Sequence, residues 1–145
     1  MELSLKTEYS ILALIELASN YGTDQPLQIR QIASQQKIPD RYLEQLLAAL
    51  RRHGFVKSQR GAKGGYVLGR EPRQISVLEV ILCVEGTKQT AQEQGKALLP
   101  PGTSVVRELW QASQQKAAEV LGSCSIKDLC DREVQRRLSA TMYYI

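Results

Sequence analysis

The first 53 residues alternate between apolar and polar positions with the period of an α-helix. In residues 4–21 this period is carried by Leu5, Tyr9, Leu12, Ile15 and Leu17. No glycine or proline interrupts the pattern before Gly22, which predicts a first helix that belongs to the core. Residues 29–34 predict a short second helix. It must end before Pro39, because a proline pushes the preceding residue out of the helical region.

A third helix is predicted from Pro39 to His53. Its apolar stripe consists of Tyr42, Leu43, Leu46, Leu47 and Leu50. Its other side is mainly polar and carries Arg41, Glu44, Gln45, Ala48, Arg51 and Arg52. We expect Gly54 to end this helix, because glycine readily adopts the left-handed conformation that closes a helix C-terminus.

Two short strands are predicted on either side of the glycine-rich turn at residues 61–65. Two helices joined by a tight connection and followed by such a hairpin have the element order of a winged helix-turn-helix. The predicted fold class is therefore mainly α with a small β-hairpin, with a winged helix-turn-helix domain over residues 1–75.

Residues 76–145 are predicted to form a helical region for dimerisation or sensing. Ser76 and Glu79 have the spacing of a capping box, which predicts a helix that begins there and reaches about Val84. Residues 87–103 are polar, contain two adjacent prolines and show no period, so they predict a flexible loop.

Two further helices are predicted at the C-terminal end, over residues 104–121 and from Ser125 to about Leu138. The first of them has a broad apolar face, which on a single helix requires a partner. The residues expected to hold two copies of the chain together are Val105, Val106, Leu109, Trp110, Ala117 and Val120. These C-terminal helices are thus predicted to make the chain a homodimer.

Positive charge is concentrated in one segment. Between Arg51 and Arg73 there are seven basic residues and one acidic residue, whereas the net charge of the whole 145-residue chain is only +4. The rest of the chain is therefore slightly acidic. A local excess of cations beside a helix and a hairpin predicts that double-stranded DNA is the partner.

The residues expected to contact DNA are Arg41, Tyr42, Glu44, Gln45, Arg51, Arg52, Arg60, Gly61, Lys63 and Gly64. Near the start of a recognition helix, glutamine suits adenine, glutamate accepts from cytosine N4, and arginine reads guanine or phosphate. At the turn of the hairpin, Arg60 and Lys63 are long cations suited to a narrow minor groove or to phosphates. The hairpin is thus predicted to be a DNA-binding wing.

Enzymatic activity is not expected. The single histidine, His53, lies between two arginines and a helix-ending glycine, which is more typical of a backbone or phosphate contact than of a general base. No apolar run reaches the length that spans a bilayer, so a membrane partner is not expected. The N-terminus lacks the order of a signal peptide, and a cytoplasmic location is expected.

Several short motifs resemble the Rrf-two (Rrf2) family of winged-helix transcriptional regulators. They are Tyr42-Leu43-Glu44-Gln45-Leu46-Leu47, Leu50-Arg51, Gly54-Phe55-Val56, Arg60-Gly61, Gly64-Gly65-Tyr66 and Val84-Glu85-Gly86. The resemblance implies a sequence-specific DNA-binding regulator that binds an inverted-repeat operator as a homodimer. It also places Glu44 and Gln45 on the recognition helix and Arg60 on the wing. The alternative is a protein-binding adaptor that keeps the fold with vestigial DNA binding.

The cysteines depart from the pattern of this family. Its cluster-binding members carry three cysteines in the loop after the Val-Glu-Gly motif, whereas residues 87–103 contain none. The three cysteines present, Cys83, Cys124 and Cys130, are an odd number without a CxxC spacing, which argues against a disulfide framework. No cofactor is predicted. An iron–sulfur site or a redox-active thiol built from these cysteines stays an alternative to ordinary packing, and a protein or small-molecule effector is the other candidate signal.

Overall fold

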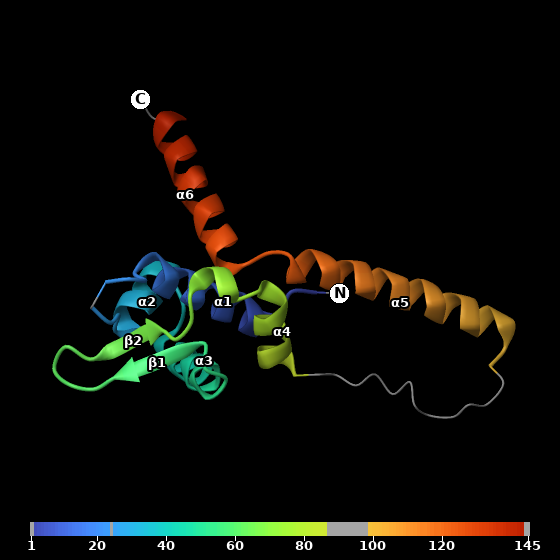
Figure 1. Cartoon of the computed structure of the whole chain (residues 1–145), viewed down its shortest axis with the longest axis horizontal. Helices are drawn as coiled ribbons and strands as arrows, with labels where there is room; N and C mark the ends of the chain where they lie inside the picture. The colour runs from blue at the N-terminus through green and yellow to red at the C-terminus, as the bar shows by residue number, and fades with distance from the viewer. Residues whose placement is uncertain (1, 24, 87–98, 144–145) are drawn as a thin grey trace.

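The computed structural model describes residues 2–23, 25–86 and 99–143. Within these residues the chain forms six α-helices, a short 3-10 helix and one antiparallel hairpin (Figure 1). In chain order the elements are α1 Leu5–Ser19, α2 Ile29–Gln36, α3 Asp40–Arg52, β1 Val56–Gln59, β2 Gly65–Leu68, η1 Pro72–Gln74, α4 Val77–Glu85, α5 Pro101–Gly122 and α6 Ile126–Tyr143. The predicted fold class, mainly α with a small hairpin after the third helix, is confirmed.

Serine side chains begin α4 and α6 where the sequence predicts them. The Ser76 hydroxyl accepts from the backbone N–H of Glu79 at 3.1 Å, and the Glu79 carboxylate accepts from the N–H of Ser76 at 3.2 Å. This reciprocal capping box satisfies two N–H groups that have no partner inside α4. Ser125 and Asp128 form the same arrangement before α6, with distances of 3.1 and 2.9 Å. The hydrogen bonds from Ser125 hold the pKa of the Asp128 carboxyl below its ordinary value.

The core is built around α1, which packs against α2, α3, α4, α6 and β2. The side chains of Ala13 and Leu14 on α1 are fully buried. The same apolar cluster includes Val80 of α4 and Ile126 of α6, so one core contains residues from both sides of residue 75. A division into two domains at that residue stays a prediction.

The end of α4 is tied to the start of α1. The hydroxyls of Ser4 and Thr7 both donate to Oε1 of Glu85, the last residue of α4. Thr7 is buried and Ser4 caps α1, accepting from the N–H of Thr7 at 3.1 Å. The Glu85 carboxylate therefore links the end of α4 to the first residues of α1.

The hairpin is paired along both sides of its second strand. β1 pairs with β2 in the register Val56↔Leu68 to Gln59↔Gly65. On the other side of β2, Tyr66 exchanges two backbone hydrogen bonds with Leu27, at 2.7 and 2.9 Å. This third segment packs so closely that a Cβ on Gly65 would lie 2.4 Å from the carbonyl oxygen of Leu27. Only glycine fits there.

The C-terminal helices differ from the prediction in their bounds. Helix α5 begins at Pro101, within the predicted loop, rather than at Ser104. Proline is favoured in the first turn of a helix, because its missing N–H has no partner there in any case. Residues 87–98 of that loop lie outside the described residues. Helix α6 reaches Tyr143 rather than Leu138, since no glycine or proline interrupts it. None of the helices in the described ranges is long and apolar enough to cross a bilayer.

We predict that Gly65→Ala lowers the free energy of unfolding by roughly 1–3 kcal/mol, because the added methyl group collides with the backbone of Leu27 and breaks the Leu27–Tyr66 pairing. Urea unfolding followed by circular dichroism measures the change. Gly102→Ala is the matched control, since a Cβ there meets nothing within 4 Å. Equal stability of the two variants would contradict the prediction.

Candidate nucleic-acid interface

Helix α3 carries apolar side chains on one side and polar side chains on the other. Four leucines are buried in or against the core, and they are Leu43, Leu46, Leu47 and Leu50. Arg41, Glu44 and Gln45 are exposed on the opposite side, in the first two turns of the helix. Tyr42 lies at the border, half-buried, with its ring edge-on to that of Tyr9 at a centroid distance of 5.7 Å. The side of α3 predicted to read bases is therefore free to enter a groove.

The C-terminal end of α3 is basic and contacts the wing. Arg51 and Arg52 are both exposed in its last turn, where cations interact favourably with the helix dipole. Nη1 of Arg51 donates to the hydroxyl of Ser58 on β1 at 3.2 Å, a contact that sequence spacing did not predict. Nδ1 of His53 lies 3.0 Å from the carbonyl oxygen of Ala49, so this histidine makes the backbone contact expected for it.

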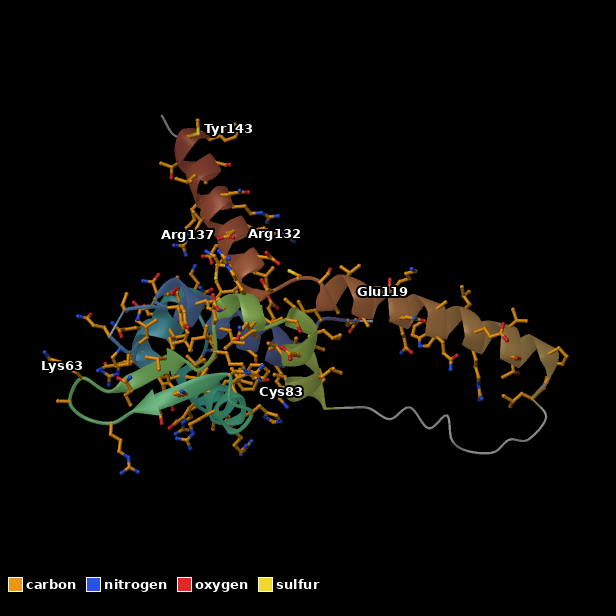
Figure 2. The ribbon with its side chains drawn as sticks, in the orientation of Figure 1. Lys63, Cys83, Glu119, Arg132, Arg137 and Tyr143 are labelled. Atoms are coloured by element: carbon orange, nitrogen blue, oxygen red, sulfur yellow. The ribbon has the colours of Figure 1, made fainter. Side chains whose placement is uncertain are left out.

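The wing presents its cations on a tight, glycine-dependent turn. Arg60, Gly61 and Lys63 are exposed, and Figure 2 shows Lys63 at the outer end of the hairpin, pointing away from the helices. Gly61 has a φ of 118°, which side chains rarely tolerate. Gly64 donates its N–H to the carbonyl of Gly61 at 2.9 Å, and a Cβ on it would lie 2.4 Å from the Gln59 carbonyl oxygen. The turn therefore requires both glycines.

Ion pairs with acidic side chains decide whether the cations of α3 and the wing are available to DNA. Within the described residues, the interface cations that form no ion pair with a carboxylate are Arg41, Arg51, Arg52, Arg60 and Lys63. Each of these cations is exposed. The charge is therefore available to phosphate groups rather than neutralised within the protein.

The three cysteines lie outside the set of predicted DNA-contacting residues and have different surroundings. Cys83 is half-buried on α4, and burial raises its pKa against the lowering effect of Arg52, Arg70 and Lys6. Burial also raises the pKa of Cys130, whose Sγ lies 3.7 Å from the carbonyl oxygen of Ile15. Cys124 is half-buried between α5 and α6. All three are free thiols.

Within one protomer, the described residues do not form a metal or cluster site. In the described part of the chain, no group of three or more His, Cys, Asp or Glu side chains is arranged to hold a metal ion. The residues outside the described ranges contain neither cysteine nor histidine. Figure 2 shows Cys83 at the end of α4 that faces away from the connection between α5 and α6. Iron–sulfur clusters need thiolates that converge on one point, and within one protomer these do not.

Comparison with known proteins identifies the family of the chain. The family model described as "Rrf2: Iron-dependent Transcriptional regulator" matches residues 3–132. The HTH-type transcriptional regulator CymR of Bacillus subtilis is 37% identical over 145 residues, which is 100% of both chains. The HTH-type transcriptional regulator IscR of Xenorhabdus nematophila is 35% identical over 130 residues, which is 89% of this chain and 79% of that protein.

Solved structures are similar over nearly the whole chain. The structure of T. potens IscR has a TM-score of 0.78 at 35% identity and covers 92% of this chain and 88% of its own. The structure of CymR, the global cysteine regulator of B. subtilis, has a TM-score of 0.77 at 36% identity, with 91% and 98% covered. The family model, the relatives and the shared fold agree, and the chain therefore belongs to the Rrf2 family and is a DNA-binding transcription regulator.

Proposed function

We propose that this regulator binds an inverted-repeat operator as a homodimer, with α3 of each protomer in the major groove and each wing in the adjacent minor groove. The main support is that the two surfaces predicted to contact DNA, on α3 and on the wing, are in contact with each other. The hydrogen bond from Arg51 to Ser58 connects the basic end of α3 with β1 of the wing. We therefore expect one duplex to contact both elements.

Base selection belongs to the first turns of α3. Gln45 presents an amide that can donate to and accept from adenine, and Glu44 presents a carboxylate that accepts from cytosine N4. Both side chains are exposed and lie next to Arg41, whose guanidinium is suited to guanine or to phosphate. The recognition helix thus distinguishes sequences, whereas Arg51 and Arg52 at its other end contribute mainly phosphate contacts.

The wing supplies affinity. Arg60 and Lys63 lie on either side of a turn whose glycines allow the backbone to approach the groove closely. An arginine in a narrow minor groove gains from the enhanced negative potential there. Contacts of this kind favour A·T-rich sequence beside each half-site.

Dimerisation is proposed to use α5. No residue of α5 is buried within the protomer, and Figure 1 shows the helix extending away from the body of the protein. Its large exposed apolar side chains are Val105, Val106, Leu109, Trp110 and Val120, with half-buried Ala117 between them. An exposed apolar face of this size marks an interaction site. Helix α6 adds a second exposed stripe that sequence analysis missed, formed by Val134, Leu138 and Met142.

A closed two-fold dimer explains the inverted repeat. Two copies that use the same surface are related by a two-fold axis, and their recognition helices then meet DNA half-sites of opposite direction. Operator binding without an iron–sulfur cluster follows from the dispersed thiols described above. The signal is then a protein, a small molecule or oxidation of a thiol.

We predict that Arg60→Ala and Gln45→Ala have different effects on operator binding. Arg60→Ala weakens binding by roughly 1–3 kcal/mol. It also lowers the slope of log affinity against log salt by the amount that corresponds to about one phosphate contact. Gln45→Ala mainly relaxes the base preference at one position of each half-site. Fluorescence anisotropy at fixed salt, on duplexes selected from a random library, measures both. Lys127→Ala on α6 is the charge control. Unchanged affinity and preference in both wing and helix variants would sink the assignment.

We predict that the chain is a dimer at micromolar concentration and that Leu109→Asp makes it a monomer, because an aspartate cannot be buried in an apolar interface without a partner. Equilibrium sedimentation measures the mass. Gln115→Asp is the control, since this exposed residue lies away from the apolar stripe of α5 at helical spacing. A monomeric wild-type chain contradicts the proposal.

We predict that anaerobic cluster reconstitution leaves no bound iron and that Ala substitutions at Cys83, Cys124 and Cys130 leave operator affinity unchanged. The physical reason is the lack of convergent thiolates. Iron analysis, absorbance in the sulfur-to-iron charge-transfer region and anisotropy are the measurements. Stoichiometric iron that is lost in a cysteine variant, together with altered affinity, would show instead that the chain senses through an unusual cluster.

A further inference from the structure

Arg70, which follows β2, lies at the place where the wing returns to the helices. Cζ of its guanidinium group is 4.5 Å from the centroid of the Phe55 ring. Its Nη1 is 3.7 Å from Oε1 of Glu79 on α4, and its Nη2 donates to the carbonyl of His53 at 3.4 Å. One side chain therefore contacts the end of α3, the residue before β1 and the first turn of α4.

The backbone next to Arg70 also packs closely against the residues that follow α3. The N–H of Gly69 donates to the Phe55 carbonyl at 2.8 Å, and a Cβ on Gly69 would lie 2.6 Å from the carbonyl oxygen of Gly54. Phe55 itself donates its N–H to Leu50 of α3 at 3.0 Å. Both ends of the hairpin are thus held against the C-terminal turn of α3 at this point.

Two of the three partners of Arg70, Phe55 and Glu79, differ in burial. Phe55 is 3% exposed, so its ring is a fixed platform for the guanidinium group. The side chains of Arg70 and Glu79 are 35% and 48% exposed, so their ion pair alone is weak. Glu79 is itself held in place, because its Oε2 accepts from Ser76 in the capping box. The carboxylate therefore serves the start of α4 and the end of the wing at the same time.

We propose that Arg70 is a positioning residue that fixes the wing relative to α3 by linking Phe55, His53 and Glu79. Its contribution to DNA binding is indirect, unlike that of Arg60. The inference rests on the proposed function in one respect, namely that α3 and the wing contact the same duplex. If Arg70 were a direct phosphate contact, the Glu79 carboxylate beside it would weaken binding by repelling DNA and by competing for the guanidinium group.

The variant Glu79→Gln distinguishes a positioning role of Arg70 from a direct phosphate contact. It lowers operator affinity in the first case and leaves it unchanged or raises it in the second. Glutamine is accepted at this position of a capping box, so the start of α4 is kept while the anion is removed. For a positioning role we expect roughly 2- to 5-fold weaker operator binding, as for a half-exposed ion pair. Arg70→Gln also loses the contact with Phe55, so its effect is about 5- to 10-fold. The double variant is expected to bind no more weakly than Arg70→Gln, because both changes break one contact.

Two controls change charge in the same way on α6, outside the hairpin. Lys127 and Asp131 form an ion pair on α6 at 2.9 Å. Lys127→Gln removes a cation, as Arg70→Gln does, and Asp131→Asn removes an anion, as Glu79→Gln does. We expect both controls to keep wild-type affinity within about 2-fold, since an exposed ion pair contributes little.

The salt dependence of binding and amide hydrogen exchange complete the test. A positioning role leaves the slope of log affinity against log salt unchanged in Arg70→Gln. It accelerates exchange of the Gly69 amide, while exchange of the amides inside α3 stays unchanged. The proposal is overturned if Glu79→Gln binds as well as or better than wild type while Arg70→Gln loses about one phosphate contact from the slope. It is also overturned if Gly69 exchange does not change in either variant. If Arg60→Ala has no effect on binding, the proposed wing contact fails, and Gly69 exchange alone decides the role of Arg70.

Discussion

Burial of the apolar side of α1 is the constraint on which the other elements depend. Five elements pack against this helix, and Ala13 and Leu14 at its centre are fully buried. Burying a leucine side chain contributes about 1.5–3 kcal/mol, so this contact surface outweighs any single hydrogen bond of the fold. Helix α3 takes its orientation from it through Leu43 and Leu47. A helix that carries no predicted DNA contact thus decides where the recognition helix lies.

The C-terminal helices are attached to the same core by main-chain bonds. The N–H of Val77 donates to Cys124, and the N–H of Ile126 donates to Ile75, both at 2.9 Å. Ile126 is fully buried and fixes the first turn of α6 beside α1. Because α5 ends at this same junction, the direction of the proposed dimerisation helix is set relative to α3. In the proposed dimer, the spacing of the two half-sites then depends on the folded protomer as well as on the dimer contact.

The sequence predicted those features that depend on residues close together in the chain. The start of α4 follows from Ser76 and Glu79, and the exposure of Gln45 and Arg60 follows from helical spacing and from a glycine-rich turn. Local signals did not give the full length of α5 and α6, because a proline after a polar stretch fits a loop as well as a first helical turn. They also did not reveal the role of Arg70, whose partners come from three separate elements and meet only when the hairpin folds back onto α3 and α4.

The pairing of Tyr66 with Leu27 has a consequence for how such a regulator changes over evolution. A strand bonded along both edges cannot slide by one residue without losing both sets of hydrogen bonds. The base of the hairpin is therefore held in one register whatever the turn contains. Exposed turns anchored at both ends tolerate insertions and exchanges. Wing tips can then acquire a new length or charge, and with it a new preference for groove width, while the placement of α3 is inherited unchanged.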